Sequence, residues 1–118
     1  MKDPFFLTEL SFKLGSLEIF LQRKGLSWAV VRFEIPRAFR FFNESDNFSY
    51  LKNYEGESLL DGDQESCISE SRTAPYLKEY FKNTPDTRLE DGLRSIIIIT
   101  PQECVEVISF ENPSIEML

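Results

Sequence analysis

The fold is decided by residues 10–35, which read LSFKLGSLEIFLQRKGLSWAVVRFEI. Apolar and polar side chains alternate along this stretch, which is the period-2 pattern of strands with one buried face. Two turns that contain glycine, Gly15-Ser16 and Arg23-Lys24-Gly25, divide the stretch into three strands. The inward faces are expected to carry Leu10, Phe12, Leu14, Leu17, Ile19, Leu21, Ala29, Val31, Phe33 and Ile35. We therefore predict a β-meander over residues 1–35.

Two further apolar patterns predict a helix and a hairpin. Pro75 is followed by apolar residues at helical spacing, and this spacing predicts a helix with one apolar stripe made of Tyr76, Leu77, Tyr80 and Phe81. The run Ser95–Thr100 contains four consecutive isoleucines, which predicts an inner strand covered on both faces. Residues 100–103, TPQE, predict a turn that leads into a second strand, Cys104–Phe110.

Together these elements predict an α+β fold. Residues 36–42, PRAFRFF, are expected to begin a short helix, because proline is tolerated in a first helical turn. We predict a single domain, 1–118, with a sheet of about five strands, mainly antiparallel, and two or three short helices packed on one face. In this interpretation residues 36–92 contain helices plus an acidic loop, 93–110 form a β-hairpin, and 111–118 form a loose tail.

Acidic residues are concentrated between positions 43 and 70, a stretch called the acidic segment below. It contains eight carboxylates and one base, Lys52, a net charge of −7 that equals the formal charge of the whole chain. Residues 1–42 sum to +3 (seven basic, four acidic) and residues 71–118 to −3 (five basic, eight acidic). The charge is therefore dipolar, and the acidic segment should attract cationic ligands and repel phosphate. Direct nucleic-acid binding is not expected.

The residue types present exclude most common catalytic and metal sites. The chain has no histidine, which removes Ser-His-Asp and Cys-His mechanisms and histidine-based zinc sites. Two cysteines, Cys67 and Cys104, are too few for a four-cysteine zinc site. Residues 61–65, DGDQE, begin like an EF-hand loop, but Ser66 replaces the required glycine and Arg72 the bidentate glutamate. We predict no cofactor, no metal and no enzymatic activity.

The acidic segment also contains aromatic residues, which dominate binding hot spots, whereas charges at the rim mainly set the association rate. The predicted partner-binding residues are Glu44, Asp46, Phe48, Tyr50, Tyr54, Glu55, Glu57, Asp61, Asp63 and Glu65. The predicted function is that of a non-catalytic protein-binding module that docks on a basic partner. Nucleic-acid enzymes are one such class of partner, and immunity-type proteins and phage inhibitors that neutralise them share this size and charge. With no export signal or spanning segment in the sequence, we expect a cytoplasmic protein that binds no membrane.

Two other classes of function stay open. One is a self-associating subunit or scaffold component, which would pair through exposed edge strands and Trp28. The other is a carboxylate-based enzyme, which would need a pocket that contains an acid of raised pKa. The binding hypothesis itself predicts that Asp61, Asp63 and Glu65 changed together to serine would lower the affinity for a basic partner.

Overall fold

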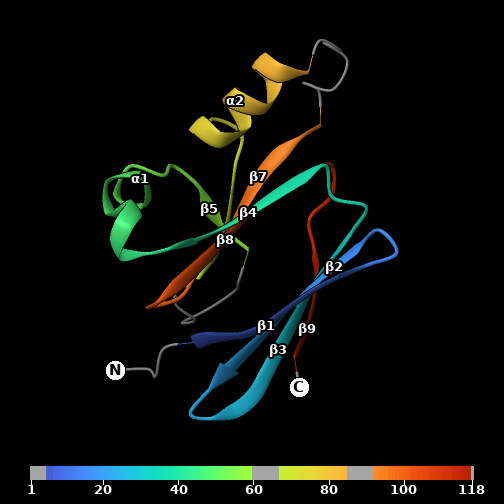
Figure 1. The fold of residues 1–118 in the computed structure, drawn as a ribbon, viewed down its shortest axis with the longest axis vertical. Helices are drawn as coiled ribbons and strands as arrows, with labels where there is room; N and C mark the ends of the chain where they lie inside the picture. The colour runs from blue at the N-terminus through green and yellow to red at the C-terminus, as the bar shows by residue number, and fades with distance from the viewer. Residues whose placement is uncertain (1–4, 60–66, 85–91, 118) are drawn as a thin grey trace.

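A computed structural model describes residues 5–59, 67–84 and 92–117, which form two antiparallel sheets and three helical segments (Figure 1). The four-stranded sheet has the order β1-β2-β3-β9, with strands at Phe5–Lys13, Ser16–Arg23, Leu26–Glu34 and Ser114–Met117. The five-stranded sheet has the order β4-β8-β7-β6-β5, with strands at Ala38–Asn43, Glu103–Ser109, Arg94–Ile99, Ile68–Ser71 and Glu57–Ser58. The helical segments are η1 (Ser45–Asn47), α1 (Phe48–Lys52) and α2 (Pro75–Asn83). The predicted α+β class with antiparallel pairing is confirmed.

The main core lies between the two sheets, which pack face to face. The alternation in the meander places Leu17, Ile19 and Leu21 of β2 on this inner face, and all three are buried. The five-stranded sheet contributes β-branched side chains from β6, β7 and β8, namely Ile68, Ile96, Ile98, Val105 and Val107. β-branched residues pack well on a pleated surface, so both sheets present the side chains that such a core favours.

The second face of the five-stranded sheet, called the outer face below, is covered by α2. Leu77 of α2 packs with Leu93 and Ile108 in a separate apolar cluster, to which Tyr76, Tyr80 and Phe81 add partly buried rings. The isoleucines of β7 are therefore covered on both sides, as the sequence predicts for an inner strand. Pro75 stands at the start of α2, where a proline costs no helical hydrogen bond.

The predicted helix at residues 36–42 is wrong, because this stretch forms strand β4. It pairs with β8 in antiparallel register, with Arg40 opposite Glu106 and Phe42 opposite Cys104. Aromatic residues favour strands, and the alternation of Arg40 and Phe42 with Phe39 and Phe41 is a period-2 pattern. The contact between Phe39 and the core between the sheets outweighs the helix-starting preference of Pro36.

Four other expectations need correction. The tail is not loose: β9 pairs with β3, and Ile115 packs against the main core. This extra strand and the short strands β4, β5 and β6 give two sheets where one of about five strands was expected. Cys67, whose polar neighbours in the sequence predict an exposed thiol, is buried like Cys104, and the two are not bonded to each other. Phe12, Leu14 and Ile35, expected to point inward, are exposed. The side chain of Trp28 lies outside the described part of the chain.

Candidate functional site

The first part of the acidic segment, residues 43–58, crosses the outer face of the five-stranded sheet. It leaves the sheet at the end of β4, continues through η1 and α1, and re-enters at β5, and β4 and β5 are the two opposite edges of that sheet (Figure 1). The crossing begins with a backbone hydrogen bond from Glu44 N–H to the Gln102 carbonyl, 3.1 Å. This part of the segment therefore packs on the outer face of the sheet. The side chains of the sheet beneath it provide its hydrogen-bond partners.

A buried carboxylate, that of Glu106 in β8, holds the acidic segment. Its residue is 0% exposed, and it lies between two valines that point into the main core. Arg40 donates to Oε1 from Nε (3.1 Å) and from Nη2 (2.8 Å). Ser95 of β7 donates to Oε2 from Oγ, at 2.6 Å. Burying a charge is costly unless it is paired and hydrogen-bonded, and here both carboxylate oxygens have donors.

Tyr50 and Tyr54 connect the acidic segment to this carboxylate. The Tyr50 hydroxyl lies 2.9 Å from Oε1 and 2.7 Å from Oε2 of Glu106, to which it donates. The Tyr54 hydroxyl donates to the Ser95 carbonyl oxygen at 3.2 Å, and it lies 3.0 Å from Ser95 Oγ, which itself donates to Glu106. Tyr76 N–H donates to the Tyr50 hydroxyl oxygen, 3.4 Å, which ties α1 to α2. The name Glu106 cluster is used below for Arg40, Tyr50, Tyr54, Tyr76, Ser95 and Glu106.

Aromatic rings surround the guanidinium of Arg40. Its Cζ lies 4.8 Å from the ring centroid of Phe42, 4.7 Å from that of Tyr50 and 4.5 Å from that of Tyr76. Ring faces attract a cation, so the rings favour this position of the charge. Burial alone would lower the pKa of Arg40, but the hydrogen bonds and the charge of Glu106 raise it above its ordinary value. Arg40 therefore keeps its charge at this partly buried position.

Burial also acts on the phenols of the Glu106 cluster. It raises the pKa of Tyr50, with a further contribution from the hydrogen bond and charge of Glu106. Burial likewise raises the pKa of Tyr54 and of Tyr76. Because Tyr50 and Tyr54 hold their protons more strongly than ordinary tyrosines do, their hydroxyls stay protonated and remain hydrogen-bond donors beside Glu106.

The predicted partner-binding residues separate into two groups in the structure. Tyr50 and Tyr54 are half-buried, and their hydroxyls serve the Glu106 cluster. Phe48 is 64% exposed. Glu44 is half-buried, whereas Asp46, Glu55 and Glu57 are exposed. Asp61, Asp63 and Glu65, and with them the EF-hand-like stretch, lie outside the described residues.

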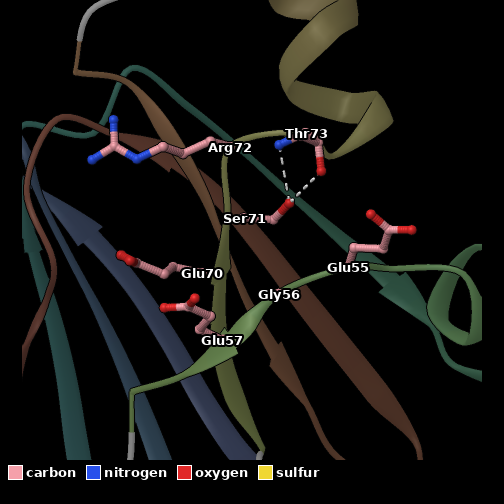
Figure 2. A pocket seen from close by; sticks show the side chains of 7 residues that line it. All are labelled: Glu55, Gly56, Glu57, Glu70, Ser71, Arg72 and Thr73. Atoms are coloured by element: carbon pink, nitrogen blue, oxygen red, sulfur yellow. Dashed lines mark hydrogen bonds between the residues drawn. The ribbon is translucent and has the colours of Figure 1, made fainter.

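A pocket of about 430 Å³ opens where the acidic segment enters β5. It is lined by Glu55, Gly56, Glu57, Glu70, Ser71, Arg72 and Thr73. Figure 2 shows the carboxylates of Glu57 and Glu70 on one side of the β5–β6 pair and that of Glu55 on the other. Glu57 and Glu70 are direct cross-strand partners, an arrangement that is unfavourable for two like charges. We call this site the acidic pocket.

Among the described residues, Glu70 is the one carboxylate of the acidic pocket that forms an ion pair, although Arg72 also lines the pocket. Glu70 Oε2 lies 3.5 Å from Arg94 Nη1, but it accepts no hydrogen bond within the described structure. In the parts of the chain that are described, no ion pair involves Asp46, Glu55 or Glu57. The arginines Arg32 and Arg40 pair with acids outside the segment, Glu18 and Glu106. A cationic group from another molecule would therefore find carboxylates that this chain does not neutralise.

Gly56 is required at the mouth of the acidic pocket. A Cβ at this position would lie 2.6 Å from the Glu70 carbonyl oxygen and 2.7 Å from the Tyr54 ring. We expect Gly56→Ala to lower the free energy of unfolding by about 1–3 kcal/mol, measured by urea denaturation, because the backbone must shift. Gly92→Ala is the control, since its Cβ would meet only the Phe110 side chain, at 3.1 Å. Equal losses in the two variants would show that Gly56 is not specially constrained.

Sequence reasoning missed the centre of this site. Glu106 and Ser95 lie in strands that were recognised as core elements, and Arg40 lies in the stretch assigned to a helix. The signal that was available is the single carboxylate in CVEVI, residues 104–108, where every neighbour is apolar. A charge at such a position is retained only with a buried partner, so it indicates a polar cluster on the outer face.

Comparison of the chain with protein-family models, with curated proteins and with solved structures gives no match. Across residues 5–59, 67–84 and 92–117, no helix has the length and apolar character needed to cross a bilayer. The same ranges contain no group of three or more acidic or cysteine side chains placed to hold a metal ion. The chemistry that the described site offers is attraction of cationic groups by unpaired carboxylates.

Proposed function

We propose that this protein is a non-catalytic cytoplasmic binding module that docks on a basic protein surface through its acidic segment. The observation that carries the proposal is the pairing pattern: Arg32 and Arg40 pair with Glu18 and Glu106, and within the described residues Asp46, Glu55 and Glu57 form no ion pair. Carboxylates that are not neutralised by ion pairs within the chain attract an approaching cationic molecule more strongly.

Binding would combine long-range attraction with short-range anchoring. The unpaired carboxylates would accelerate the encounter with a basic partner, and exposed Phe48 would supply apolar contact once the two surfaces meet. The acidic pocket, at about 430 Å³, has room for a lysine or arginine side chain of the partner. Tyr50 and Tyr54 contribute indirectly, because they hold the segment in one conformation and so reduce the entropy lost on binding.

A nucleic-acid enzyme is the partner class that we propose, because such enzymes present a large basic surface where phosphates bind. Occupying that surface with carboxylates would inhibit the enzyme. The carboxylate-based enzyme receives no support from the most buried acid, since both oxygens of Glu106 are used by Arg40, Tyr50 and Ser95.

The test compares two variants with the same charge. One carries Asp46→Asn, Glu55→Gln and Glu57→Gln; the control carries Glu9→Gln, Glu79→Gln and Glu116→Gln, which are exposed positions outside the acidic segment. The partner is captured from a host extract with the wild-type chain, and its affinity for each variant is measured at low salt. We expect the first variant to lose about tenfold to a hundredfold in affinity and the control to lose much less. Equal losses, or a partner that is itself acidic, would refute the proposal.

A further inference from the structure

Two apolar side chains protrude at the end of the molecule opposite to α1. Leu14, in the β1–β2 turn, is 106% exposed, and Ile35, between β3 and β4, is 76% exposed. Ile35 N–H donates to the Gly15 carbonyl at 2.8 Å, so the two loops lie together. Figure 1 shows these loops on the right-hand side of the view, together with the chain that leaves β8, whereas α1 lies on the left. We call Leu14 and Ile35 the apolar tip.

Both residues of the apolar tip have backbone conformations that suit other residue types better. Leu14 has φ 51° and Ile35 has φ 48°, in the left-handed region that disfavours bulky side chains and β-branched ones most of all. Leu14-Gly15 is a two-residue hairpin turn with positive φ at both positions, where asparagine or aspartate is favoured. The matched turn at Lys24-Gly25 has φ 56° and 73° and a polar residue in the same place. Within one chain, Leu14 therefore has neither a favourable backbone conformation nor a buried side chain.

A pocket that could receive such a side chain lies beside the apolar tip. It has a volume of about 420 Å³ and is lined by Glu34, Ile35, Arg37, Ser109, Phe110 and Glu111. Arg37 packs against the Phe110 ring, with its Cζ 5.0 Å from the ring centroid. The lining thus combines the apolar side chains of Ile35 and Phe110 with two carboxylates and one guanidinium, that of Arg37, and its net charge is negative.

We propose that the occupant of this pocket is Leu14 of a second copy of the chain, in a two-fold dimer in which each tip enters the other's pocket. The charges are self-complementary. Lys13 precedes Leu14 on the tip, and Glu34 and Glu111 flank the pocket, so each lysine would approach the carboxylates of the partner copy. Within the described ranges, none of these three residues forms an ion pair in its own chain.

The position of the acidic segment agrees with this choice of partner. Because the β1–β2 turn and α1 lie on opposite sides of the view, a tip-to-tip dimer would keep the two α1 helices apart and leave both open (Figure 1). In a two-fold interface the same surface of each copy meets its counterpart. Each copy must therefore carry both the protruding Leu14 and the pocket that receives it on one surface. An anionic bilayer is a poorer occupant, because the two carboxylates of the pocket would repel it.

The experiment measures the dimer dissociation constant by sedimentation equilibrium over micromolar concentrations. We expect the wild-type chain to form dimers, and Leu14→Asn to raise the dissociation constant by about tenfold or more. The monomer should not lose thermal stability, because asparagine suits the turn. Lys24→Asn, the same change in the matched turn, should leave dimerisation unchanged. A wild-type chain that stays monomeric, or a Leu14→Asn dimer as strong as the wild type, would overturn the proposal.

A charge exchange tests the reciprocal geometry separately. Lys13→Glu and Glu34→Lys should each weaken self-association, and a mixture of the two should form heterodimers, because each tip then meets a pocket of opposite charge. A mixture that remains monomeric would overturn this arrangement.

If the wild-type chain is monomeric and Leu14→Asn abolishes binding to phosphatidylcholine vesicles, the occupant is a bilayer and the dimer is wrong. The acidic-segment variants should not affect dimerisation, so this proposal and the proposed function fail independently.

Discussion

Arg40→Met is expected to lower the free energy of unfolding by about 3–5 kcal/mol, because it leaves the carboxylate of Glu106 buried without a counter-charge. Glu106 is fully enclosed, whereas the Arg40 side chain is 33% exposed and can turn toward water. Glu106→Leu should therefore be less harmful than Arg40→Met. The double variant with both changes should recover most of the lost stability, since it replaces the ion pair by apolar side chains. Urea denaturation of the three variants measures these differences.

The ranking of the three variants provides the control. A loss for Arg40→Met no greater than that for Glu106→Leu, or a double variant no more stable than Arg40→Met, would contradict this account of the Glu106 cluster.

Alkaline pH is expected to destabilise the protein steeply. Burial raises the pKa of Tyr50, Tyr54 and Tyr76, and it raises the pKa of the Cys104 thiol to about 11. An acid with a raised folded pKa keeps its proton in the folded state while the unfolded chain releases it. The free energy of unfolding therefore falls as the pH rises through the unfolded values, near 8.5 for cysteine and 10 for tyrosine, by up to about 1.4 kcal/mol per pH unit for each group.

Urea denaturation between about pH 8 and pH 11 measures this slope. Tyr50→Phe removes one of the titrating groups, together with its hydrogen bond to Glu106. It should therefore be less stable than wild type at neutral pH but lose stability more slowly above about pH 10. If the wild-type free energy of unfolding stays constant up to about pH 11, the pKa values of these phenols are not raised by burial in the folded state.

The strands of the meander could be predicted because their information is local. Leu17, Ile19 and Leu21 alternate with polar residues, and this pattern fixes which face is buried whatever lies opposite. The helix at Pro75 and the isoleucine strand β7 could be predicted for the same reason. The register of the first hairpin was predicted wrongly, because its turn lies at Leu14-Gly15, one residue before the predicted Gly15-Ser16, and Lys13 pairs with Ser16.

The elements that were missed depend on contacts between distant residues. Arg40 and Glu106 are 66 positions apart, and only their pairing shows why residues 38–43 are extended. Tyr50 and Tyr54 were expected to face a partner, but Glu106 and Ser95 beneath them turn their hydroxyls inward. The acidic character of the segment was readable from composition alone. The positions of the arginines in the folded structure determine which carboxylates form ion pairs. A single sequence does not give those positions.

The most direct test of the central claim is the association rate constant with the captured partner, measured by stopped flow as a function of ionic strength. If the unpaired carboxylates attract a basic surface, the wild-type rate falls steeply as salt is added. The variant with Asp46→Asn, Glu55→Gln and Glu57→Gln should be slower at low salt and much less salt-dependent, while the Glu9, Glu79 and Glu116 control keeps nearly the wild-type slope. Identical salt slopes for the two variants would contradict the claim, because total charge and not the acidic segment would then account for binding.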